Sequence, residues 1–241
     1  MNTVPRTRTT MSTTTIPERR GPPPLALWRL ISPMLPIGAY AYSQGLEFAV
    51  EAGWVGDEAQ ARSWLTGLLE HNLAHVDVPV LARLYEAWGR DDPAAIQYWS
   101  TYLLASREGG ELVDEDRHLG RALARLLDEL GVEQAAPWMQ ESAATFATLF
   151  ALAARHWDIP LYEAAHGYLW SWCENQVAAA MKLIPLGQSA GQRLLTAAMP
   201  AIERAAERGL ALEDEDIGAA APGLALASAR HETQYTRLFR S

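Results

Sequence analysis

The chain has 241 residues, of which 49% are hydrophobic, and it carries a net charge of −9 with an isoelectric point near 5.2. This length can bury a substantial core, whereas an acidic chain without clustered cations is a poor ligand for nucleic acid, so no nucleic-acid partner is expected. The single cysteine excludes an intramolecular disulfide framework and suits a cytoplasmic location, and no apolar run reaches the roughly 20 residues that span a bilayer, so no membrane partner is expected.

Residues 1–24 are rich in Thr, Pro and Arg, and we expect them to form a disordered tail. The ordered chain is predicted to begin near Leu25 with a short apolar helix that Pro33 and Pro36 end. Residues 35–47 then form a loop punctuated by Pro and Gly that leads into another helix. We interpret this loop either as a packed connection between helices or as a turn that faces a ligand.

From residue 57 to residue 154, apolar residues recur at steps of three and four, which predicts successive amphipathic helices joined by short turns. Asp57 and Asp92 precede two of these helices and match N-cap positions. The charged segment 106–130 keeps an apolar face, and Gly109-Gly110 within it predicts a bend or a later start of that helix.

His71 and His75 are four residues apart on a predicted helix, a spacing that is compatible with a metal site. Asn72 occupies the position of the catalytic glutamate in the metalloprotease motif, and no third ligand follows from the spacing. We interpret both histidines as packing or surface residues and expect no metal ligands and no cofactor.

Residues 161–184 predict a long helix, which Pro185 ends. Ser171, Asn175 and Lys182 fall on one polar line of this otherwise apolar helix. Lys182 is the only lysine in the chain, which suggests either a role for its compact ammonium group or chance survival near a helix end, where cations are favoured.

Gly187 supplies the turn after this helix, and Ser189 with Gln192 has the spacing of a capping box that starts the next helix. Residues 187–191 also match the G-x-S-x-G pattern of a serine hydrolase, with Asp214 or Asp216 and then His231 in the expected order. That motif requires a buried strand before the serine, where this chain has an alanine-rich helix. A hydrolase that uses Ser189 is therefore the weaker alternative, and Ser189 is interpreted as a structural cap.

In the C-terminal region, prolines interrupt the helical pattern. Pro200 is expected to begin or kink a turn that lasts to Gly209, and Pro222 breaks the chain again. Residues 227–241 mix arginines with aromatic and aliphatic residues, which is typical of a flexible terminus that docks on its own domain or binds a partner. Taken together, the pattern predicts one all-α domain of about eight to eleven helices over residues 25–226, flanked by the two tails.

Three blocks carry a resemblance to the UreF family of urease accessory proteins. They are SPMLPIGAYAYSQGLE at 32–47, YLWSWCENQVAAAMKLIPLGQSAGQRLL at 168–195 and RHETQYTRLFRS at 230–241. The resemblance implies an all-helical protein without catalytic activity, usually a homodimer. It also implies a bridge between a UreD/UreH-type scaffold protein and a UreG-type GTPase, in an assembly that delivers nickel to apo-urease, and it is compatible with regulation of that GTPase.

By matching position, the resemblance also implies which residues face partners or line the functional surface. These are Tyr42, Gln44, Glu47, Lys182, Gln188, Arg230, Tyr235, Leu238, Phe239 and Arg240.

Overall fold

The computed structural model describes residues 24–241, so the structure expected for residues 1–24 lies, apart from Pro24, outside the described part of the chain. Ten α-helices and no strand occur in this part, which confirms the predicted all-α domain. Their bounds are α1 Leu25–Leu30, α2 Leu46–Glu51, α3 Glu58–Leu68, α4 Asp77–Gly89, α5 Pro93–Ala105, α6 Gly110–Glu129, α7 Phe146–His156, α8 Leu161–Leu183, α9 Gln188–Leu210 and α10 Pro222–His231.

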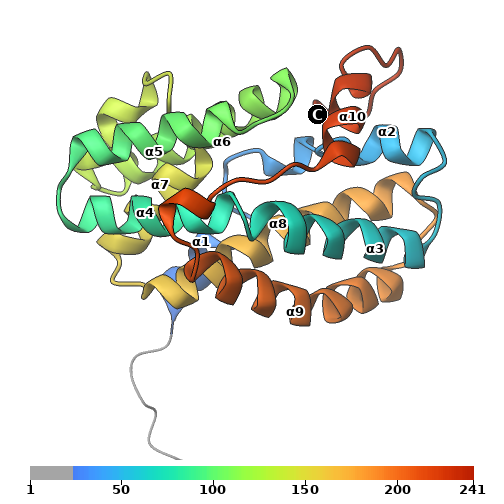
Figure 1. Ribbon diagram of the computed structural model, residues 1–241, viewed down its shortest axis with the longest axis horizontal. Coiled ribbons are helices and arrows are strands. Elements are labelled where there is room, and N and C mark those ends of the chain that lie inside the picture. The colour runs from blue at the N-terminus through green and yellow to red at the C-terminus, as the bar shows by residue number, and fades with distance from the viewer. Residues whose placement is uncertain (1–23) are drawn as a thin grey trace, which may run out of the picture.

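The helices form two groups that meet at α4 (Figure 1). Helices α3, α8 and α9 pack against one another on one side, and α5, α6 and α7 pack on the other. Helix α4 contacts α5 and α7 as well as α8 and α9, so it joins the two groups. Helix α10 returns to α2 and α6, which brings the C-terminal region next to the beginning of the fold.

The core is built from the predicted apolar stripes. Leu81 and Leu84 of α4, Phe150 of α7 and Leu169 of α8 are at most 1% exposed and belong to one continuous cluster. Each such side chain contributes about 1.5 to 3 kcal/mol through removal of apolar surface from water. None of the helices between residues 24 and 241 is long and apolar enough to cross a membrane.

Several helix ends follow the sequence signals. The carboxylate of Asp57 accepts a hydrogen bond from the backbone N–H of Gln60, and Asp92 caps α5 through Ala95 in the same way. Helix α6 begins at Gly110 with Gly109 extended before it, so the predicted later start is confirmed.

Three expectations about the second half are wrong. Helix α9 begins at Gln188 with Gly187 as its N-cap and without a side-chain cap, so Ser189 and Gln192 do not form a capping box. Ser189 already lies inside the first turn, where its hydroxyl does not meet the free N–H groups in cap geometry. The turn expected from Pro200 is also absent, because α9 continues through Pro200 to Leu210. The boundary between residues 226 and 227 falls inside α10 and does not separate a domain from a tail.

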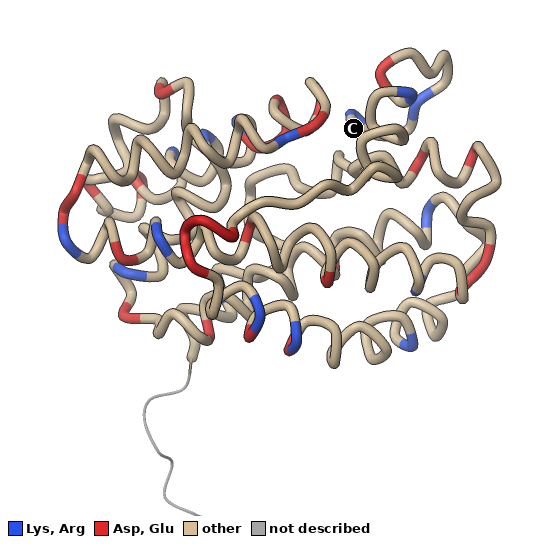
Figure 2. Tube along the Cα trace, viewed as in Figure 1, with Lys and Arg blue, Asp and Glu red and all other residues tan. Residues whose placement is uncertain are grey.

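Charged residues are spread over many elements of the described chain, with acidic and basic positions interspersed (Figure 2). The most acidic turn, Asp214–Asp216, follows α9 and is tied to α4 by an ion pair of 2.7 Å between Arg83 and Asp214. This exposed pair makes a small contribution to stability, about 0 to 1 kcal/mol.

Candidate interaction site

The three sequence blocks that carry the resemblance meet in space. The loop before α2, one side of α8 and the last ten residues of the chain form a single network of contacts with α6. We call residues 232–241 the tail. The tail, which was expected to be flexible, lies docked on its own domain, and the docking depends mostly on polar contacts.

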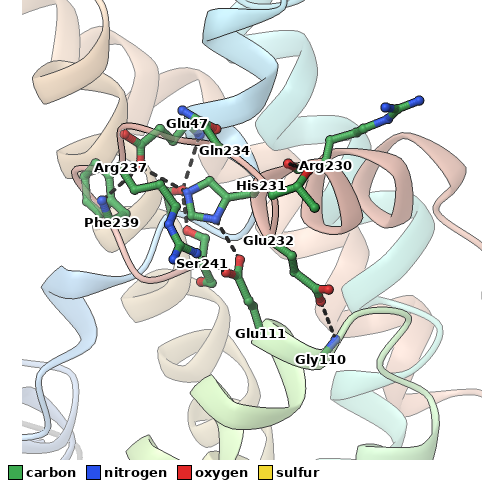
Figure 3. Close-up of polar contacts among 12 residues, drawn as sticks. Glu47, Gly110, Glu111, Arg230, His231, Glu232, Gln234, Arg237, Phe239 and Ser241 are labelled. Carbon is green, nitrogen blue, oxygen red and sulfur yellow. Dashed lines mark hydrogen bonds and ion pairs between the residues drawn. The ribbon is translucent and has the colours of Figure 1, made fainter.

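Glu47 of α2 is the main anchor of the tail (Figure 3). Its side chain is buried, and its carboxylate accepts the backbone N–H groups of Leu238 at 2.6 Å and Phe239 at 2.8 Å. Hydrogen bonds to a carboxylate are about twice as strong as neutral ones. A single side chain therefore fixes the path of the tail backbone.

His231, the last residue of α10, connects this anchor to α6 (Figure 3). Its side chain is 0% exposed, with Nε2 3.1 Å from a Glu47 carboxylate oxygen and Nδ1 2.6 Å from a Glu111 carboxylate oxygen. Arg237 of the tail contacts the second oxygen of Glu111 at 2.6 Å. We call Glu47, His231, Glu111 and Arg237 the charge chain.

A second set of contacts holds the end of the tail. The hydroxyl of Ser241 donates to Glu115 of α6, and both the N–H and the hydroxyl of Ser43 donate to the main-chain oxygen of Ser241. Gln44 donates to the other oxygen of Glu115 and accepts from the indole N–H of Trp172. Burial raises the pKa of Glu115 to about 7 against these hydrogen bonds, so this carboxyl is substantially protonated near neutral pH.

The polar line of α8 faces the loop and the tail. The amide of Asn175 donates to the main-chain oxygen of Tyr42, whose hydroxyl lies 3.2 Å from His118. The ammonium of Lys182 lies 5.2 Å from the Phe239 ring centre and 6.0 Å from that of Tyr40. Lys182 thus contacts the loop and the tail through cation–π interactions.

The docked tail divides its apolar residues between the interior and solvent. Phe239 is buried, whereas Leu238 is 65% exposed and Tyr235 is fully exposed. Arg230 and Arg240 are also exposed, and Tyr40 of the loop is 72% exposed. Docking therefore produces a surface that combines aromatic, aliphatic and cationic side chains.

A cavity of about 250 Å³ lies beneath the loop, between α6 and α8. Gln44 and Glu115 line it on the side of the tail, and an ion cluster lines its other side. In this cluster, the Arg107 guanidinium pairs with Asp77 and Asp116, and the hydroxyl of Tyr168 donates to Asp77. Burial and these carboxylates raise the pKa of Tyr168, which keeps its phenol protonated.

The weak metal candidates are not supported. His71 is exposed, and His75 is partly buried with a pKa lowered chiefly by that burial. Within residues 24–241 no group of three His, Cys, Asp or Glu side chains has the arrangement of a metal site. Burial also raises the pKa of Cys173 to about 12, so it stays a thiol.

The hydrolase alternative is contradicted by the geometry. Ser189 is exposed at the start of α9, directly after Gln188, which is also exposed. Both ring nitrogens of His231 face Glu47 and Glu111, and Asp214 pairs with Arg83. His231 and Asp214 therefore have other partners, and Ser189 lacks the partners that a catalytic triad requires.

The structure brings Tyr42, Gln44, Glu47 and Lys182, which the sequence analysis named, close to one another and to residues of α6 that the sequence analysis did not name. Glu111 and Glu115 lie on the inward side of that helix, next to the apolar stripe and not on its solvent side. Their four-residue spacing beside Leu112 and Leu119 was the available signal, because it places them on one face. The sequence analysis named no site residue in this segment.

Comparison with known proteins identifies the family of the chain. A family model described as UreF matches residues 55–199. The chain is 60% identical over 215 residues to "Urease accessory protein UreF" of Alkalilimnicola ehrlichii, covering 89% of this chain and 94% of that protein. It is 50% identical over 222 residues to the protein of the same name from Hahella chejuensis, covering 91% and 100%. The Chromohalobacter salexigens protein of that name is 49% identical over 221 residues, covering 90% and 96%.

Proposed function

Because the chain belongs to the UreF family of urease accessory proteins, we propose that it bridges a UreD/UreH-type scaffold protein and a UreG-type GTPase during nickel insertion into apo-urease. Membership of this family gives the chain a role in urease maturation and makes it a non-catalytic protein. The identity of the partners, the bridging and the delivery of nickel as cargo are the parts that we propose.

The observation that carries the proposal is the composition of the surface around the docked tail. Tyr235 and Leu238 are exposed although they are largely apolar, and residues 230–241 also carry the exposed cationic side chains of Arg230 and Arg240. Tyrosine and arginine are enriched at the energetic centres of protein interfaces. This surface fits a partner with an apolar groove and an acidic rim, and we assign it to the scaffold protein.

The buried candidates support this surface from below. Glu47 and Phe239 fix the path of the tail, while Tyr42 and Gln44 hold the loop on which it lies. Lys182 contacts both segments. Gln188, at the start of α9, remains a candidate for a second contact region, which we assign to the GTPase.

Co-purification with the scaffold and the GTPase tests the proposal. Truncation after Ala229 removes Arg230, His231 and the tail, whereas Tyr235→Ala combined with Leu238→Ala removes only the exposed apolar groups of the tail. We expect both changes to abolish capture of the scaffold. Tyr98→Ala, on α5, is the matched control because Tyr98 is 59% exposed and outside the tail. A double variant that still captures the scaffold at the wild-type level would contradict the assignment.

We also propose that the chain acts as a homodimer in the cytoplasm and that it influences GTP hydrolysis by the GTPase. Sedimentation equilibrium of the purified chain measures the first property. Turnover of GTP by the GTPase, with and without the chain and scaffold, measures the last. A monomer at micromolar concentration, or an unchanged turnover rate, would remove the corresponding part of the proposal.

A further inference from the structure

The cavity beneath the loop has an acidic lining. Five of its lining residues carry a carboxyl group, whereas one carries a cationic side chain. That cation, Arg107, pairs with Asp77 and Asp116 and so compensates one of their two charges. The remaining carboxyl groups that line the cavity belong to Glu108, Glu115 and Glu174.

These three carboxyl groups have no cation beside them in the described chain. None of them forms an ion pair within residues 24–241. Burial raises the pKa of Glu174, and it raises the pKa of Glu115 to about 7. A carboxyl group whose pKa rises on burial is one whose charge no neighbouring cation offsets. A cation in the cavity would therefore be stabilised there.

The walls of the cavity select the kind of cation. Aromatic side chains line it, namely Tyr40, Phe146, Tyr168 and Trp172. A guanidinium group stacks on aromatic faces, pairs with both oxygens of a carboxylate in one plane and is carried on an apolar stem. Since no three potential ligand side chains within residues 24–241 have the arrangement of a metal site, the lining fits an arginine side chain better than a metal ion.

Helix α1 forms one wall of this cavity and fixes where the preceding chain begins. Leu30 and Ile31 line the cavity. A Cβ at Gly167 of α8 would lie 2.6 Å from Leu27 and 3.0 Å from Ile31, so α1 packs directly on α8. Glu174 lies seven residues, or about two turns, after Gly167 on the same face of α8. The C-terminal end of α1 therefore lies beside the part of the cavity that Glu174 lines.

Residues 1–23, which we call the N-terminal segment, carry cations that fit this site. The segment contains four arginines and one glutamate. Arg19 and Arg20 precede Pro24 by five and four residues, a stretch that spans at most about 13 to 18 Å. Helix α1, with six residues, is about 9 Å long. Both arginines can therefore reach the end of α1 that borders the cavity.

We propose that the N-terminal segment docks in this cavity through Arg19 and Arg20, whose guanidinium groups pair with Glu174 and stack on the aromatic walls. A tether this short gives an effective concentration on the order of millimolar, so even a weak contact is populated. A segment that is expected to be disordered can bind in this way, because only a few of its residues need to be ordered. This inference goes beyond the proposed function, because it concerns the chain alone and needs no partner.

A nitroxide label on the full-length chain tests the docking. Thr15→Cys places the label four residues before Arg19, and the label reacts only there, because burial raises the pKa of Cys173 to about 12 and keeps it a thiol.

The label should broaden the indole N–H resonance of Trp172, which lines the cavity, much more than that of Trp88. Trp88 is the reference because it lies about 16 Å along α4 from Asp77, which lines the cavity. Equal broadening of the two resonances would overturn the proposal.

Two pairs of substitutions in the labelled chain identify the arginines. Arg19→Gln with Arg20→Gln should lower the docking equilibrium constant, derived from the broadening, by about fivefold. Arg6→Gln with Arg8→Gln is the matched control, because it removes the same charge from the same segment, and it should have little effect. An unchanged constant in the first pair, or an equal loss in both pairs, would overturn the proposal.

Substitutions on α8 identify the cavity as the place of docking. Glu174→Gln should weaken docking, whereas Glu163→Gln should not, because Glu163 is exposed on the same helix and does not line the cavity. Docking that is unaffected by Glu174→Gln would overturn the proposal. If Glu174→Gln fails to fold, the two pairs of arginine substitutions decide.

Discussion

At the scale of single residues, Glu47 of α2 holds the tail through more contacts than any other side chain of the site. Glu47 accepts two backbone N–H groups of the tail and contacts His231, all from one buried carboxylate. Removing one partner of a buried charge network is costly because the remaining charges stay desolvated.

Glu47→Ala should therefore release the tail and destabilise the fold by about 3 to 5 kcal/mol. The free energy of unfolding in urea measures the loss, and proteolysis at Arg237 reports release of the tail. Glu51→Ala is the control, since Glu51 lies exposed on the same helix and should change stability by less than about 0.5 kcal/mol. Equal effects of the two substitutions would show that Glu47 is not an anchor.

Glu115 makes the stability of the whole protein depend on pH. Burial raises the pKa of its carboxyl from the ordinary value of 4.5 to about 7. A raised folded pKa means that the contribution is fully present below the unfolded value and is lost as the pH rises through the folded one. The wild type should thus lose up to about 3 kcal/mol from this group between pH 4.5 and pH 8.

Glu115→Gln keeps a hydrogen-bonding side chain of the same size without a charge. The difference in unfolding free energy between the variant and wild type should therefore shift in favour of the variant as the pH rises. Urea titrations at both ends of the range measure it. A difference that stays constant with pH would mean that Glu115 is not buried in solution.

At the scale of elements, the attachment of α10 to α2 depends on Gly45. Gly45 has φ of +75°, and a Cβ there would lie 2.9 Å from the Cβ of Ala227. Gly53, at the other end of the same helix, has φ of +74° but nothing within 4 Å of its Cβ position. The two glycines share a backbone conformation and differ only in packing.

Gly53→Ala should therefore cost about 1 kcal/mol, the price of a left-handed alanine. Gly45→Ala should cost at least about 1 kcal/mol more and should increase hydrogen exchange in α10. Thermal unfolding with hydrogen exchange checks both effects. If the two substitutions had the same effect, close packing between α2 and α10 would be refuted.

Element by element, the sequence predicted helices better than their ends. Asp57, Asp92 and Gly109-Gly110 gave correct starts, because a cap or a glycine acts locally. Ser189 failed because Gly187 lies extended two residues earlier and lets the helix start at once. The π-helical turn at Leu69–Leu73, between α3 and α4, has no local signal, and its extra residue depends on the packing of both neighbours.

At the scale of the whole molecule, the candidate site was predictable as three segments but not as one place. The loop, α8 and the tail each have an unusual sequence. The spacing of apolar residues, however, does not predict the hydrogen bond between residues 43 and 241. Partners of α6 were missed because Glu111 and Glu115 resemble the exposed acids around them. Burial, which is a property of the assembled fold, separates these two carboxylates from exposed acids of the same helix such as Asp114.

The docked tail also relates the loop, the cavity and the exposed surface to one another. Gln44 and Glu115 line the cavity and at the same time hold the loop and the tail. A change that undocks the tail therefore alters both the outer surface and one wall of the cavity. This connection gives the surface around Tyr235 and Leu238 a defined shape before any partner binds.

The central claim is that this surface is required for urease maturation, and the nickel content of urease tests it most directly. Urease is purified from cells that lack the chain and from the same cells supplied with wild type, with Tyr98→Ala, or with Tyr235→Ala and Leu238→Ala combined. We predict nickel-loaded urease with wild type and Tyr98→Ala, and nickel-poor, inactive urease without the chain or with the double variant. Urease that is fully loaded with nickel in the absence of the chain, or with the double variant, would contradict the account.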